Sequence, residues 1–282
     1  GAAGGTDTTV RYFAAMMEKE LGQPVILVNR TGGSGVVGHS AIAQAPADGY
    51  TIGMITVEIS MMHWQGLTEL NPTSYTPLAL VNADPAGFTV RADSPYKSVR
   101  EVLDYARANP GKLNFASVGN GSSSHLNAEL LKSMAGIDAV HVPFNGSPPA
   151  VLSTVQGETQ MIFAVMQPLQ AQVQAGKLRA LAVTTPKRFP LLPDLPAVAE
   201  TYPGFEALAW NGLVVPSATP AATVQKINAE VGAILKQPDV VQKMNGFGFD
   251  LIGGTPADFA ALIKGEAERW TPVVKRLGIK VD

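Results

Sequence analysis

Apolar residues follow two different spacings along the chain, and the two spacings alternate. The helical spacing over residues 6–21 places Val10, Phe13, Met17 and Leu21 on one face, and Gly22 ends that helix. Short apolar runs that predict strands lie at residues 24–28, 51–57, 112–116, 139–142, 160–165, 179–184 and 207–216. Strands that alternate with helices predict an α/β fold.

Helix starts carry local signals in several places. Ser98 and Glu101 have the spacing of a capping box, and the predicted helix ends near Asn109. Thr219-Pro220 and Thr255-Pro256 each combine a capping residue with a proline suited to the first helical position. These pairs predict two long helices near the end of the chain.

Two loops rich in glycine and hydroxyl residues precede predicted helices. The first is Gly4-Gly5-Thr6-Asp7, and the second runs from Ser117 to His125 as S-V-G-N-G-S-S-S-H. The start of a helix presents backbone N–H groups that have no internal partner, together with the positive end of the helix dipole. Glycine allows close approach to that backbone, and Ser or Thr adds small donors. The two loops therefore predict binding of one small anion from two sides.

Composition narrows the classes of protein. The chain has 282 residues, of which 46% are hydrophobic and 16% charged, so it is globular and has one or two domains. The formal net charge of −2 and the lack of basic runs argue against a nucleic-acid partner. No window has the roughly 20 apolar residues of a membrane span. With no cysteine, thiolate metal sites are excluded, and no metal or cofactor is expected.

Two stretches have the composition of crossovers between lobes, namely residues 83–93 and 202–210. We therefore predict two lobes. Residues 1–92 together with 206–282 form the first, which is discontinuous, and residues 93–205 form the second.

An alternative interpretation rests on Gly33-Ser-Gly-Val-Val-Gly38, which matches the dinucleotide fingerprint G-x-G-x-x-G and follows a predicted strand. Glu58 lies about 20 residues further on, where such sites hold a ribose. This pattern would suit an NAD-dependent oxidoreductase. Residues 30–32 lengthen the turn and the next helix is short, so a loop shaped for close packing or another ligand is favoured.

Other candidates for chemistry are weaker. No G-x-S-x-G elbow occurs, and Ser122–Ser124 lie too close to His125 in sequence to form a nucleophile–base pair. The four histidines have no metal-binding spacing. His125 is expected either to orient its loop or to contact the ligand. Asp7 either contacts the ligand or stabilises the helix dipole, and Glu58 either faces the ligand or faces solvent.

The two loops also carry a family resemblance, which extends over nearly the whole chain. Gly4–Asp7 followed by Arg11 resembles P-G-G-x-x-D…R, and Gly119–Leu126 resembles G-x-G-S-x-x-H-L. Further matches are Asn29–Gly38 with N-K/R-P-G-A-G-G-x-x-G, Ala47–Thr51 with P-D-G-Y-T, Pro110–Ser117 with P-G-K-L-N-Y-A-S, Val142–Gly146 with V-P-Y-K-G, and the stretches Gly176–Val183 and Trp210–Leu213. The chain thus resembles the substrate-binding proteins of the tripartite tricarboxylate transporter family, also called the Bug family.

The resemblance implies a type II periplasmic-binding-protein fold, in which two α/β lobes joined by a hinge close on a ligand in the cleft between them. It implies a monomeric periplasmic receptor without catalysis, which passes a small organic acid to the subunits of a membrane permease. By position in the motifs, Gly5, Thr6 and Asp7 would face Ser122 and Ser123 across the carboxylate. The rest of the pocket would be formed by Glu58, Phe144, Asn145, Ala164 and Met166.

Departures from the family pattern bear on the ligand. Asn145 replaces a usual lysine, and Ala164 stands where an aspartate is common. An aspartate there would suit an amino group, so its absence argues against amino acids. Glu58 would instead suit an ammonium group or a protonated second carboxyl. We expect a dicarboxylate, with an aromatic carboxylate as the next choice.

Overall fold

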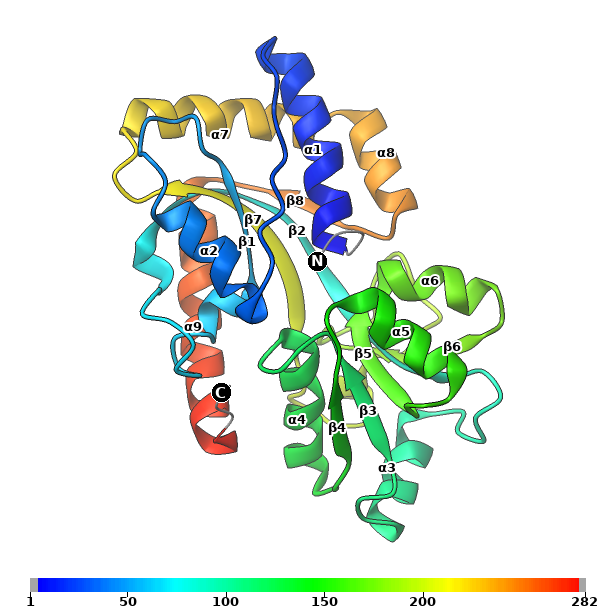
Figure 1. Ribbon diagram of the computed structural model, residues 1–282. Coiled ribbons are helices and arrows are strands. Elements are labelled where there is room, and N and C mark those ends of the chain that lie inside the picture. Colours follow the sequence, from blue (N-terminus) through cyan, green and yellow to red (C-terminus); the bar gives the residue numbers. More distant parts are fainter. Residues whose placement is uncertain (1–4, 279–282) are drawn as a thin grey trace. The chain divides into compact units, whose positions relative to one another are not determined.

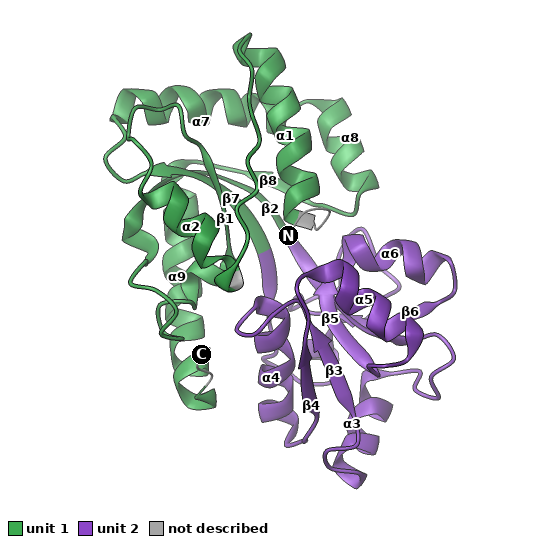
Figure 2. Ribbon diagram, in the orientation of Figure 1, with its two compact units in different colours: residues 1–83, 210–282 green, residues 84–209 purple. Residues whose placement is uncertain are grey.

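The computed structural model describes residues 5–278, which divide into two compact units (Figures 1 and 2). Unit 1 comprises residues 1–83 and 210–282, and unit 2 comprises residues 84–209. The helices are α1 (Gly5–Leu21), α2 (Val36–Ala43), α3 (Val99–Ala108), α4 (Ser123–Ala135), α5 (Ser147–Gln156), α6 (Met166–Gln174), α7 (Ala221–Leu235), α8 (Pro238–Gly246) and α9 (Pro256–Leu277). The strands are β1 (Gly53–Thr56), β2 (Tyr75–Arg91), β3 (Asn114–Ser117), β4 (Val140–Pro143), β5 (Met161–Val165), β6 (Leu178–Val183), β7 (Leu208–Pro216) and β8 (Leu251–Gly253).

Unit 1 is an antiparallel sheet with helices packed on it. Strand β1 pairs antiparallel with β7, and the first part of β2 pairs antiparallel with β8. The predicted apolar face of α1 is buried, because Phe13 and Met17 lie in one core cluster with Val231 and Ile234 of α7. This packing fixes α1, whose first turn contains Gly5, Thr6 and Asp7 of the first glycine-rich loop.

Unit 2 contains the parallel part of the fold. Strand β3 pairs parallel with both β4 and β5, while the second part of β2 pairs antiparallel with β5 and β6. Helices α4 and α5 both pack against β3 and β5. Because the three parallel strands point the same way, the loops that follow β3, β4 and β5 emerge at one edge of the sheet, where α/β proteins commonly bind ligands.

The chain passes from one unit to the other within β2, between Ala83 and Asp84, and again near the start of β7. The sequence places these boundaries at 92/93 and 205/206, just after β2 and just before β7. The units instead change inside a continuous strand, because β2 pairs with β8 in unit 1 and then with β5 and β6 in unit 2.

Two local predictions are wrong. Residues 24–28 form no strand, and Ile26 and Val28 are 84% and 64% exposed. An apolar run needs a partner strand, and within residues 5–278 none pairs with this one. The predicted N-cap of α7 is wrong by one position, because the helix begins at Ala221 and Pro220, not Thr219, is its N-cap. The Thr219 hydroxyl instead donates to the Pro216 carbonyl. At α9, by contrast, the Thr255 side chain caps the helix as predicted.

Candidate functional site

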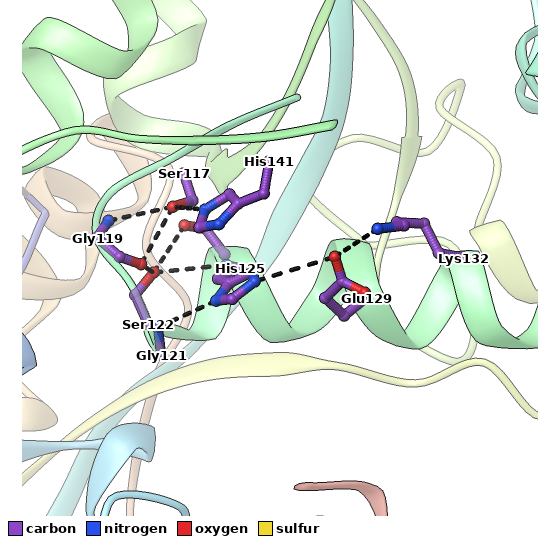
Figure 3. A network of polar contacts seen from close by, with 9 residues as sticks. Ser117, Gly119, Gly121, Ser122, His125, Glu129, Lys132 and His141 are labelled. Atoms are coloured by element: carbon purple, nitrogen blue, oxygen red, sulfur yellow. Dashed lines mark hydrogen bonds and ion pairs between the residues drawn. The ribbon is translucent and has the colours of Figure 1, made fainter. Parts of the chain in front are cut away.

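The second glycine-rich loop joins β3 to α4, and its serines fix its own shape (Figure 3). Ser122 is the N-cap of α4. Its hydroxyl accepts from the His125 N–H at 3.4 Å and donates to the Gly119 carbonyl at 2.6 Å. Ser124 Oγ accepts from the Val118 N–H at 2.9 Å. Because a hydroxyl has one proton, the O–H of Ser122 serves the loop itself.

Ser123 is the first residue of α4 and is partly exposed, whereas Ser122 and Ser124 are buried. The N–H groups of the first turn of an α-helix precede any intrahelical carbonyl partner, and the helix dipole makes this end positive. The arrangement can therefore bind an anion through backbone dipoles, and the segment from Ser117 to His125 contains no lysine or arginine.

The loop that follows β4 lies beside the second glycine-rich loop, residues 117–125, which we call the serine loop. The Phe144 N–H donates to the Ser117 carbonyl at 2.9 Å, and the Gly146 N–H donates to the Val118 carbonyl at 3.2 Å. Phe144 is partly buried against an apolar cluster of unit 2, and Asn145 is exposed. The structure thus brings Ser122, Ser123, His125, Phe144 and Asn145 onto two adjacent loops.

Ala164 and Met166 lie deeper, around the end of β5. They are 3% and 5% exposed and belong to the apolar core cluster of unit 2. Met166 covers Gly87 of β2, where an added Cβ would come 2.3 Å from the methionine sulfur. Both side chains therefore pack within the unit.

Two stacked histidine rings lie beside the serine loop (Figure 3). The His125 and His141 rings are 3.7 Å apart between centroids and nearly parallel. His141 Nε2 lies 2.6 Å from Ser117 Oγ, and the Gly121 N–H donates to His125 Nδ1 at 3.0 Å. Burial lowers the pKa of His125 to about 3 and the pKa of His141 to about 4. Both rings are therefore uncharged at neutral pH.

In unit 1, the first turn of α1 is held by side chains from distant parts of the sequence. The Thr6 hydroxyl donates to Asn211 Oδ1 at 2.9 Å, and the Asn211 amide donates to Asn82 Oδ1 at 3.3 Å. Asn211 is not among the residues predicted for the site, although it lies in the Trp210–Leu213 motif. Gly5 begins α1, and Gly4 lies outside the described residues.

The Asp7 carboxylate is buried and already paired. It accepts from the Arg11 guanidinium at 3.0 Å and from the Asn29 amide at 2.7 Å. The carboxylate lies in the first turn, where it favours the helix dipole. Asp7 thus ties the start of α1 to the segment around Asn29.

Glu58 lies in a 3₁₀ turn, Val57–Ser60, directly after β1, and is partly exposed. Its charge favours the protonated form of His39, but burial dominates and lowers the pKa of His39 to about 4. The side chain of Glu58 therefore acts electrostatically on a buried neutral histidine of α2.

The G-x-G-x-x-G segment does not form a dinucleotide loop. No strand precedes it among residues 5–32, and its first three residues form a 3₁₀ turn. An added Cβ at Gly38 would come 2.8 Å from the Arg30 carbonyl oxygen, so this glycine serves close packing. The structure therefore gives no support to the oxidoreductase alternative.

The contact between Ser117 and His141 does not resemble an accessible nucleophile–base pair. Ser117 does contact a histidine ring, but it is 0% exposed and cannot reach a substrate. Among the described residues, no group of histidine and acidic side chains could hold a metal ion. No helix in the described part of the chain is long and apolar enough to cross a bilayer.

The family model described as "Tripartite tricarboxylate transporter family receptor" matches residues 9–279. A protein encoded in the tcbD-tcbE intergenic region of a Pseudomonas species is 36% identical over 96% of this chain and 82% of its own length. The Bordetella pertussis protein BugT is 30% identical over 99% of this chain and 87% of its own length.

Solved structures agree in fold. An R. palustris protein solved with adipate has a TM-score of 0.90 and 32% identity, and the match covers 99% of this chain and 95% of that one. MatC from Rhodopseudomonas palustris, solved with bound malate, has a TM-score of 0.87 and 30% identity, covering 97% and 96%. The fold is therefore the two-lobed α/β fold of periplasmic binding proteins, as predicted. Members of the matched family are substrate-binding receptors and not enzymes, and the chain belongs to this tripartite tricarboxylate transporter family of receptors.

Proposed function

We propose that this chain is a periplasmic receptor that captures a small dicarboxylate and delivers it to a membrane permease of the tripartite tricarboxylate transporter type. Two relatives solved with ligands contain adipate and malate, which are both dicarboxylic acids. Family membership supports the periplasmic location and the permease partner. An aromatic carboxylate remains the second choice of ligand.

The observation that carries the proposal is the start of α4, which is capped by Ser122 and carries no cationic side chain in its loop. We propose that first-turn N–H groups of α4 and the Ser123 hydroxyl donate to one ligand carboxylate. Hydrogen bonds to a charged acceptor contribute about 1.5–3 kcal/mol each. A few of them, less the cost of ordering the ligand, would give micromolar affinity or better.

We propose that the first turn of α1 supplies the second set of donors, through the backbone of Gly5, Thr6 and Asp7. The Thr6 and Asp7 side chains already bond to Asn211, Arg11 and Asn29, so their role is to hold the turn. The proposal requires both helix starts to reach one ligand. The two units would then close about β2 and β7, because only a closed state allows both to contact the acid.

Selection of the acid would fall to those predicted site residues that are at least partly exposed. We propose that Glu58, Phe144 and Asn145 contact the distal part of the ligand, with His125 holding its loop. Ala164 and Met166 are packed in the core of unit 2, so they would act by shaping the pocket from behind.

A thermal shift screen tests the proposal directly. The panel contains adipate, malate and other dicarboxylates, benzoate, acidic amino acids and NAD. A ligand at 100 times its dissociation constant stabilises the folded protein by about 2.7 kcal/mol, which is readily detected. We expect dicarboxylates to stabilise the protein most. Stabilisation by NAD alone, with every acid inactive, would overturn the proposal.

Two serine variants on α4 locate the site. Ser123→Ala should weaken binding of the acid chosen by the screen, because it removes a proposed donor. Ser133→Ala is the matched control, since Ser133 is exposed on the same helix. Equal affinities of these two variants would remove the Ser123 hydroxyl from the binding site.

Delivery to a permease requires a test in cells. Deleting the gene in its host should abolish uptake of the radiolabelled acid, and osmotic shock should release the protein. Uptake that is unchanged in the deletion strain would exclude the transport role while leaving acid binding intact.

A further inference from the structure

We propose that His125 is the positioning residue of the serine loop, and that this loop keeps its anion-binding shape only while His125 and His141 are both uncharged. The proposal rests on the proposed function for its consequence, which is acid binding. The positioning of the loop itself is argued only from contacts within unit 2 (Figure 3).

The first step concerns the protonation state of His125. Its Nδ1 accepts the hydrogen bond from the Gly121 N–H at 3.0 Å. A ring nitrogen accepts only when it carries no proton, so the single proton of the neutral ring lies on Nε2. Nε2 is 3.9 Å from Glu129 Oε1, an oxygen that suits a donor on that side.

The second step links this bond to the helix start. Gly121 has a φ of +70°, a conformation that favours glycine, and it directly precedes the N-cap Ser122. The bond to His125 therefore fixes the residue that directly precedes the N-cap of α4. Without it, the turn from Gly119 to Ser122 loses a cross-link, and the first-turn N–H groups lose their fixed direction.

The third step brings in His141 of β4. Its ring lies nearly parallel to that of His125 at 3.7 Å, and the Phe115 ring stacks on both. Its Nε2 contacts Ser117 Oγ, which itself accepts from the Gly119 N–H at 3.3 Å. Both histidines thus hold opposite ends of the same turn.

Charge decides how the pair responds to acid. The charged groups around the pair are Lys132 and Glu129 of α4, which form an ion pair at 2.7 Å, while β3 contributes Phe115 and Ser117, which are uncharged. Burial, the neighbouring ring and Lys132 lower the pKa of His125 to about 3, and burial and Lys132 lower the pKa of His141 to about 4.

Protonation would undo the loop. A proton on His125 Nδ1 would face the Gly121 N–H, so that two donors would oppose each other. Two charged rings in face-to-face contact would also repel. The hold on an anion is therefore insensitive to pH near neutrality and fails in acid.

Two substitutions separate the hydrogen bond from the ring. His125→Asn places an amide oxygen near the position of Nδ1 and removes the titrating ring. His125→Phe keeps a flat ring for stacking and removes the acceptor. His63→Asn is the control, because His63 belongs to unit 1 and its Nδ1 contacts the Thr68 carbonyl.

The first readout uses the free protein, so it does not depend on any ligand. Amide hydrogen exchange at about pH 7 should show that His125→Phe lowers the protection of the Gly121 N–H by about tenfold, the equivalent of one hydrogen bond. Protection in His125→Asn should stay within about threefold of wild type. Unchanged protection in His125→Phe, or equal loss in both variants, would overturn the proposal.

The second readout is the dissociation constant for adipate and for malate, measured by calorimetry at the same pH. We expect about tenfold weaker binding in His125→Phe and near-native binding in His125→Asn and His63→Asn. If wild type binds neither acid, the proposed function fails for these ligands, while hydrogen exchange still decides the positioning role.

Acid titration followed by NMR provides a third readout, which also serves if His125→Phe does not fold. In wild type, the Gly121 amide should shift together with both histidine rings at about pH 4 or below. His125→Asn should lose that coupled transition. A Gly121 amide chemical shift that does not change when the histidine rings are protonated would contradict the proposal.

Discussion

Acid should destabilise unit 1 through one buried histidine, His39 of α2. Its side chain is 5% exposed, and its buried Nδ1 has no hydrogen-bond partner in the described part of the chain. Burial lowers its pKa from 6.5 to about 4. The folded protein therefore keeps His39 neutral over a range in which the unfolded chain binds a proton.

The sign and size of the effect follow from this difference. Between about pH 6.5 and about pH 4 the unfolded state binds more protons, so stability falls as pH falls, and below about pH 4 the loss levels off. At about pH 5 the unfolded histidine is almost fully charged and the folded one almost fully neutral. Linkage then gives a loss of about 2 kcal/mol relative to neutral pH.

The position of the tryptophans makes the effect measurable for one unit. Trp64, Trp210 and Trp270 are the three tryptophans of the chain, and all belong to unit 1. Urea unfolding followed by tryptophan fluorescence therefore reports on unit 1, whereas His125 and His141 lie in unit 2. We expect wild type to lose about 2 kcal/mol more than His39→Gln between about pH 7.5 and about pH 5.

A second variant tests the electrostatic part of the reasoning. The charge of Glu58 favours protonated His39, so Glu58→Gln should lower the pKa of His39 further. The loss of stability should then continue below about pH 4, while the loss at about pH 5 should hardly change. Suppose that wild type and His39→Gln lose the same free energy of unfolding, within about 0.5 kcal/mol, between about pH 7.5 and about pH 5. That result would refute the account of His39 as a buried neutral group.

Three further substitutions have outcomes that the structure predicts. Gly212→Ala should destabilise unit 1 by about 1–3 kcal/mol in the same urea assay, because an added Cβ would come 1.9 Å from the Phe259 ring. The control is Gly232→Ala within α7, where no described atom lies within 4 Å of an added Cβ. It should stabilise unit 1 by about 0.5–1 kcal/mol, and equal effects of the two glycine substitutions on unfolding would contradict the packing argument. Thr255→Ala should cost about 1 kcal/mol by removing the N-cap of α9, whereas Thr271→Ala, further along α9, should cost less. Thr6→Val should cost about 1 kcal/mol and weaken acid binding, because it removes the donor to Asn211; unchanged stability would show that this hydrogen bond contributes nothing.

The elements that the sequence predicts correctly are those with a local signal. The helical spacing from Thr6 to Leu21 and the capping threonine at Thr255 depend on residues within a few positions of each other, and the structure contains both. The apolar run over 207–216 likewise forms β7. Residues close in sequence are enough to predict these elements, because each element is stabilised by its own apolar spacing or its own cap.

The long strand β2 shows where local reasoning fails. Pro85 and Gly87 suggest a crossover loop, yet the strand runs straight through them. Pro85 lies between Asn82, which pairs with β8, and Ala86, which pairs with β5. A proline is tolerated at this change of partner because it interrupts neither ladder. The prediction for residues 24–28 is wrong in the opposite sense, because a strand is predicted where none forms. An apolar run does not show whether a partner strand exists.

The site illustrates a limit of reasoning from residue types. Motifs identify Ser122, Thr6 and Asp7 as ligand contacts, but each side chain is already bonded within the fold, to Gly119, Asn211 and Arg11 respectively. A hydroxyl proton that is donated to one acceptor is not available to a second. Substituting Ser122 or Thr6 should therefore change the stability of the fold together with the affinity for the acid. A motif thus locates the helix start that we propose binds the anion, and the hydrogen bonds show which of its side chains already serve the fold.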